Sequence, residues 1–112
     1  MTQPTDKELN RVLADVAGIS VEWSTRFRAW FYKKDDYRGL EWYPLTDANH
    51  MQLVKAGLTK EHGFTIHYIE MRGKYECRIW KDGVILSESI DASELRAIAL
   101  AVYAMKKDTM YA

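Results

Sequence analysis

The sequence has 112 residues, enough for one hydrophobic core and too few for two, so we expect a single domain over residues 1–112. Hydrophobic residues make up 47% of the chain and charged residues 29%, which is ordinary for a soluble globular protein. The formal net charge is +0, which excludes a global field toward nucleic acid or anionic membrane, and no apolar run approaches the roughly 18 residues of a membrane span.

The first predicted element is a helix over residues 5–17. Thr5 and Glu8 have the spacing of a capping box, and Gly18 is placed to end the helix in the left-handed region. The hydrophobic residues between them recur at helical spacing. They are Leu9, Val12, Leu13 and Val16.

An aromatic insertion follows over residues 19–43, and its pattern supports two alternatives. Hydrophobic and polar residues alternate from Ile19 to Phe31, which indicates a strand. Aromatic residues also recur at i, i+4, i+7 and i+8 from Trp23, which indicates a helix that begins at Ser24. Enrichment in aromatic and β-branched residues favours the strand, which would add residues 19–32 to the following sheet as a fourth strand.

A second helix is predicted over residues 46–62. Thr46 is expected to be its N-cap, and Asp47 suits the positive end of the helix dipole. Gly57 lies inside this helix and costs roughly 1 kcal/mol relative to alanine unless another element packs closely against it.

Residues 64–90 are predicted to form a meander of three antiparallel strands. The turns are expected at Arg72-Gly73 and at Asp82-Gly83, and the second is a strong two-residue hairpin pattern. With two-residue turns, Ile79 pairs with Ile66 and with Leu86. The core face then holds Phe64, Ile66, Tyr68, Tyr75, Cys77, Ile79, Val84 and Leu86. The opposite face, either covered by another part of the chain or available to a partner, holds Thr65, His67, Ile69, Met71, Glu76, Arg78, Trp80, Ile85 and Ser87.

The last helix is predicted over residues 92–107, with a capping box formed by Asp91 and Glu94. Its apolar stripe should pack on the core face of the meander. The expected fold is therefore an α+β domain in which three helices pack with an antiparallel meander.

Two short motifs resemble those of a known family. They are Trp-x-Pro-x-Thr-Asp, which begins at Trp42 and opens the middle helix, and Arg-Ala-Ile-Ala, which begins at Arg96. With the order of elements, they resemble the small tailed-phage proteins called the phage ABA sandwich family. The resemblance implies a helix/sheet/helix sandwich and a phage origin, and it brings no established activity or catalytic residues. The insertion at residues 19–43 departs from it.

Catalytic and metal-binding residues are not expected. Cys77 and His67 lie on neighbouring predicted strands but point to opposite faces, so they do not form a nucleophile and base. The spacing of His50, His62, His67 and Cys77 fits no common zinc pattern. The sequence has no glycine-rich phosphate loop, so we expect a protein that is not an enzyme and needs no cofactor. Its single cysteine suits a reducing compartment and no signal peptide precedes the first helix, which indicates the cytoplasm, here that of a bacterial host.

The most informative candidate surface combines aromatic and basic residues, the types enriched in protein interfaces. We expect a protein partner from host or phage, such as a host defence component or CRISPR effector. Nucleic acid bound by residues 23–38 is the alternative, less favoured because acidic residues nearly cancel the local charge, and a homodimer also remains open. The candidate partner-binding residues are Trp23, Arg26, Arg28, Trp30, Tyr32, Tyr37, Arg38, Ile69, Arg78 and Trp80.

Overall fold

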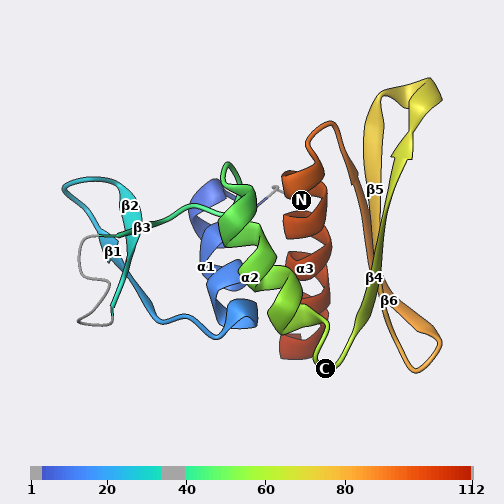
Figure 1. The fold of residues 1–112 in the computed structure, drawn as a ribbon. Helices are drawn as coiled ribbons and strands as arrows, with labels where there is room; N and C mark the ends of the chain where they lie inside the picture. The colour runs from blue at the N-terminus through green and yellow to red at the C-terminus, as the bar shows by residue number, and fades with distance from the viewer. Residues whose placement is uncertain (1–3, 34–39, 112) are drawn as a thin grey trace. The chain divides into compact units, whose positions relative to one another are not determined.

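The computed structural model describes residues 4–33 and 40–111 of the chain. Within these ranges it contains three α-helices and two three-stranded antiparallel sheets (Figure 1), which confirms the α+β class. The chain divides into two compact units, Met1–Gly57 and Leu58–Ala112. A single domain over residues 1–112 therefore stays a prediction.

Helix α1, Asp6–Ala17, opens the first unit and begins and ends as predicted. The hydroxyl of Thr5 accepts a hydrogen bond from the Glu8 backbone N–H at 3.2 Å and donates one to the Glu8 carboxylate. Gly18 adopts φ 72°, in the left-handed region that glycine enters without a steric penalty. The helix buries Leu9 and Leu13.

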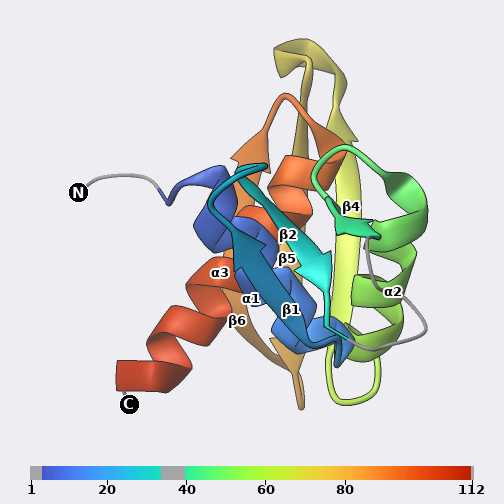
Figure 2. The same ribbon diagram turned by 90° about the vertical axis from the view of Figure 1, so that its left-hand side faces the viewer.

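The aromatic insertion folds into strands β1, Val21–Ser24, β2, Ala29–Tyr32, and β3, Glu41–Trp42. They form one antiparallel sheet in the order β1-β2-β3, and Figure 2 shows β1 and β2 side by side. The alternative of a helix beginning at Ser24 is therefore wrong. The segment is also not a fourth strand of the meander, because the chain reverses at residues 25–28 and pairs with itself.

Helix α2, Ala48–Leu58, is shorter than the predicted helix over residues 46–62. Asp47 and not Thr46 caps it, since Oδ1 of Asp47 accepts hydrogen bonds from the backbone N–H groups of Asn49 and His50 at 2.8 and 3.4 Å. An aspartate makes the better cap because its carboxylate also interacts with the helix dipole.

Gly57 marks a close crossing of α1 and α2. A Cβ atom built on Gly57 would lie 2.0 Å from the backbone oxygen of Val16 and 3.1 Å from Cα of Ala17. The glycine inside the predicted helix is thus explained, because its missing side chain lets the end of α1 approach α2.

The second unit contains the meander. Its strands are β4, Gly63–Ile69, β5, Lys74–Lys81, and β6, Val84–Asp91, with β5 in the centre. The first turn is longer than predicted, because a single turn of 3-10 helix, Glu70–Arg72, precedes Gly73. The register therefore moves by two residues, so that Ile79 pairs with Phe64 instead of Ile66. An even shift leaves the faces of β4 as predicted.

The second hairpin turns at Asp82 and Gly83, both at positive φ, as predicted. A β-bulge then breaks its register between Ile79 and Trp80, and Ile79 pairs with Ser87 instead of Leu86. The bulge adds one residue to β6, which exchanges the faces beyond it. Ser87, expected on the face opposite the core, therefore lies on the core face.

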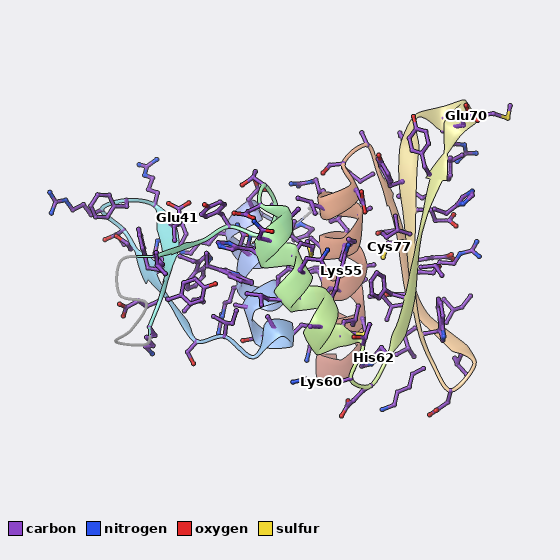
Figure 3. The ribbon with its side chains drawn as sticks, in the orientation of Figure 1. Glu41, Lys55, Lys60, His62, Glu70 and Cys77 are labelled. Atoms are coloured by element: carbon purple, nitrogen blue, oxygen red, sulfur yellow. The ribbon has the colours of Figure 1, made fainter. Side chains whose placement is uncertain are left out.

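Helix α3, Glu94–Tyr111, packs on that face of the meander, where Figure 3 shows Cys77. The hydroxyl of Ser87 donates to the backbone oxygen of Ala101 at 2.7 Å, and that of Ser89 donates to the backbone oxygen of Ala97. The helix thus contacts β6 through hydrogen bonds and β5 on the side of Cys77 and Ile79, which are both buried.

The ends of α3 differ from the prediction for residues 92–107. Ser93 and not Asp91 caps the helix, because its hydroxyl accepts from the Arg96 backbone N–H at 3.3 Å. Asp91 instead accepts from the Ser93 backbone N–H at 2.9 Å, which holds the capping residue in place. The helix continues to Tyr111.

We expect Gly57→Ala to lower the free energy of unfolding by about 1–3 kcal/mol, because a clash with backbone outweighs the roughly 1 kcal/mol gained in helix propensity. Urea denaturation measures the change. Gln52→Ala at an exposed position of α2 is the matched control and should stay within about 0.5 kcal/mol. A stabilising effect of Gly57→Ala would contradict the close crossing.

Candidate functional site

The ten predicted partner-binding residues do not form one surface. Tyr37 and Arg38 lie outside the described residues. The other eight fall in three places: the body of the β1–β2 hairpin, its turn, and the face of the meander opposite α3. The hairpin body holds Trp23, Trp30 and Tyr32, and the turn holds Arg26 and Arg28. The face of the meander opposite α3 holds Ile69, Arg78 and Trp80.

In the hairpin body, Trp23 and Trp30 form a cross-strand pair, with ring centroids 5.3 Å apart in an edge-to-face arrangement. The indole N–H of Trp30 donates to the backbone oxygen of Lys7 at 2.9 Å, and Nζ of Lys7 lies 4.2 Å from the Trp23 ring centroid. Both tryptophans are half-buried and hold the hairpin against the start of α1. Their main role is structural.

Tyr32 belongs to a second aromatic cluster, around the buried Trp42. Tyr32 packs edge-to-face on Trp42 at 5.9 Å, and His50 stacks on Trp42 at 5.2 Å. Nδ1 of His50 also accepts a hydrogen bond from the Tyr43 backbone N–H at 3.1 Å. This cluster joins β3 to α2, so Tyr32 and His50 stabilise the unit.

The turn of the β1–β2 hairpin, Thr25–Arg28, which we call the hairpin tip, is exposed throughout. The hydroxyl of Ser24 closes it by accepting from the Phe27 backbone N–H at 3.2 Å. The Phe27 side chain is 66% exposed although aromatic. The Arg26 guanidinium lies 5.3 Å from its ring centroid, and the Phe31 ring packs against it edge-to-face at 5.9 Å.

Phe27 was not among the ten residues predicted to bind a partner. Residues 25–28 include no glycine, proline, asparagine, aspartate or serine, the usual residues of a tight turn, so Ser24 just before them is the one sequence signal for this tip. The backbone of this turn is also unusual at Arg28. It adopts φ 50°, where a residue with a Cβ atom is strained.

The face of the meander opposite α3, which we call the open face, has a polar centre. Arg78 lies there, 47% exposed, with Nε at 3.1 Å from Oε1 of Glu76 and 3.2 Å from Oε2 of Glu88. Exposed ion pairs contribute little to stability, but these two carboxylates compensate the charge of Arg78. The face consists of Thr65, His67, Ile69, Lys74, Glu76, Arg78, Trp80, Ile85, Glu88 and Ile90.

The apolar residues of the open face lie around this centre. Trp80 covers Gly63 of the neighbouring strand, since a Cβ atom on Gly63 would lie 2.4 Å from Nε1 of the indole. Ile85 is 55% and Ile90 42% exposed, but Glu88 lies between them along β6. The apolar surface is therefore interrupted.

Cys77 and His67 lie on opposite faces of the meander, as the alternation along the strands predicted. Cys77 is buried toward α3, whereas His67 is exposed and opposite Glu76, whose carboxylate binds Arg78. Among the described residues, no three His, Cys, Asp or Glu side chains are grouped so that they could hold a metal ion. Within the same ranges, no helix combines the length and the apolarity that a membrane span needs.

Comparisons with protein-family models, with curated proteins and with solved structures gave no match to this chain. The resemblance to the phage ABA sandwich family therefore stays a prediction. The hairpin tip is the candidate site that the geometry favours, because it combines an exposed aromatic ring, two arginines and a strained backbone.

We expect Arg28→Gly to raise the free energy of unfolding by up to about 1 kcal/mol, because glycine relieves the positive φ at a smaller cost in chain entropy. Arg28→Ala removes the same side chain but keeps the strain, so it is the matched control and should change stability by less than about 0.5 kcal/mol. Thermal unfolding of both variants measures the difference. Equal stabilities would show that Arg28 is not strained.

Proposed function

We propose that this chain is a small phage-encoded accessory protein without enzymatic activity that acts in the bacterial host cytoplasm by binding a protein partner. A host factor or a defence component such as a CRISPR effector is the proposed partner, and occlusion of its surface the proposed mode of action. The phage origin is supported by the motifs at Trp42 and Arg96. The binding role is supported by one observation above all, the exposed Phe27 between two arginines.

Phe27 is suited to binding because its neighbours already hold it in place. Arg26 and Phe31 contact its ring, and Ser24 fixes the backbone of the turn. A side chain that is ordered before binding loses less entropy in the complex. Aromatic residues and arginine are also the types that contribute most to protein interfaces.

The charge of the hairpin tip defines the chemistry of the partner. Arg26 and Arg28 place two positive charges beside Phe27, and both side chains are exposed. A partner surface with an apolar pocket for the ring and carboxylates at its rim would match them, and opposite charges at the rim accelerate association. The open face fits a partner less well, since its arginine is compensated by Glu76 and Glu88.

Nucleic acid is the alternative occupant of the hairpin tip, because an aromatic ring between arginines can stack on a base while the arginines neutralise phosphates. Only two cationic residues lie in this four-residue turn. Protein is therefore favoured.

We expect Phe27→Ala to weaken binding of the partner about 30-fold, as loss of an interface anchor worth about 2 kcal/mol does. The partner is first captured with tagged protein from nuclease-treated host lysate, and its affinity is then measured by calorimetry. Met71→Ala, at a fully exposed position in the turn between β4 and β5, is the control and should bind like the unchanged protein. Equal affinities of the Phe27 and Met71 variants would refute the site.

The salt dependence of binding separates the two alternatives. Binding to a single-stranded oligonucleotide through Arg26 and Arg28 would give a slope of log K against log salt of about −1.4, from about −0.7 for each phosphate contact. We expect no saturable oligonucleotide binding at moderate salt, measured by fluorescence anisotropy. Saturable binding with that slope, lost in Arg26→Glu/Arg28→Glu, would favour the nucleic-acid alternative.

A further inference from the structure

Strand β4 is an edge strand of the meander, and its sequence lacks the features that usually prevent an edge strand from pairing with another strand. It lies at one side of the order β4-β5-β6, so β5 is its single strand neighbour among the described residues. Its seven residues, Gly63–Ile69, include no aspartate, glutamate, lysine, arginine or proline. Natural proteins commonly protect such edges with charges, proline or bulges, because unpaired backbone groups can bind another strand.

The other edge of the same sheet is protected in two of these ways. Strand β6 carries Glu88 and Asp91, and the bulge at Leu86 interrupts its regular backbone. Two antiparallel copies of β6 would bring four carboxylates onto one short ladder, and like charges on facing strands are destabilising. The meander thus has one edge that resists strand pairing and one that permits it.

We propose that β4 is the contact between two copies of this chain, which pair antiparallel across a two-fold axis near Ile66. In this register Phe64 lies opposite Tyr68 of the second copy, and Thr65 lies opposite His67. Each pair joins residues of the same face, and no pair joins like formal charges. The two meanders become one six-stranded sheet with an isologous contact.

The apolar side chains of β4 favour pairing with β4 of a second copy over contact with solvent. Phe64, Ile66 and Tyr68 alternate along the α3 side of the strand, and Tyr68 is still 49% exposed. In the proposed register each of these rings and the isoleucine would meet an apolar counterpart from the second copy. Aromatic and β-branched pairs of this kind are the ones that stabilise antiparallel ladders.

The inference is independent of the proposed partner site. Strand β4 shares no residue with the hairpin tip, and self-association requires no foreign molecule. A protein that binds a partner through Phe27 but stays monomeric would overturn the inference and leave the proposed function intact. A dimer that binds no partner would do the reverse.

The test introduces like charges at two positions on the exposed side of β4. Thr65→Lys/His67→Lys would place lysines opposite each other between copies, and Thr65→Glu/His67→Glu would do the same with glutamates. Thr65 faces Arg78 and His67 faces Glu76 within the chain, so each double variant gains one opposite-charge pair and one like-charge pair. The two variants are therefore matched in their effect on the monomer.

Sedimentation velocity over a concentration series measures the assembly. We expect a dimer for the unchanged protein, at least a tenfold weaker dimer for each double variant, and recovery of the dimer when the two variants are mixed. Hydrogen exchange should show that amides of β4, and not of β6, become protected as concentration rises. Circular dichroism verifies that both variants are folded.

Ile85→Lys is the control on the opposite edge, at an exposed position of β6, and it should leave the dimer unchanged. Three results would overturn the inference: a monomer at every concentration of the unchanged protein, a dimer abolished by Ile85→Lys and kept by the β4 variants, or no recovery on mixing. Binding of a foreign extended peptide at β4 by a monomeric protein would also overturn it, in favour of a hetero-partner.

Discussion

The first unit depends on two indole hydrogen bonds to one helix, of which that of Trp42 is the more buried. Trp30 and Trp42 are direct neighbours across β2 and β3, and their N–H groups donate to the backbone oxygens of Lys7 and Asn10 on α1. An indole N–H without a partner is costly in a protein interior, and these carbonyls, three residues apart on one side of α1, satisfy both donors. The short sheet is thus held by the helix and would be marginal alone.

Much of the fold could be predicted because local physics decides it. The start of α1 depends on the hydrogen bonds of Thr5, and its end depends on the positive φ of Gly18. The second hairpin likewise depends on positive φ at Asp82 and Gly83, and all of these features are found as expected. The errors arose where tertiary packing decides between local alternatives. The bulge beside Ile79 is such a case, because it turns Ser87 toward α3, where its hydroxyl finds a helix carbonyl.

The candidate site was harder to predict than the fold, since composition cannot distinguish an aromatic residue that anchors a sheet from one that faces solvent. Trp30 and Tyr32 were expected at a binding surface, but one contacts α1 and the other packs on Trp42. Phe27 shares their chemistry and differs only by its place in a turn. Arg78 was expected to be an available charge, and the two glutamates beside it became apparent only from the strand register.

The distribution of tryptophans has a spectroscopic consequence. Trp23, Trp30 and Trp42 lie in the unit Met1–Gly57, whereas Trp80 alone represents the unit Leu58–Ala112. The edge-to-face rings of Trp23 and Trp30, 5.3 Å apart, are close enough for their electronic transitions to couple and to give an excitonic couplet in circular dichroism. Intrinsic fluorescence and this couplet therefore both report mainly on the unit Met1–Gly57, whereas the far-ultraviolet amide signal sums over α1, α2 and α3 and reports on both units.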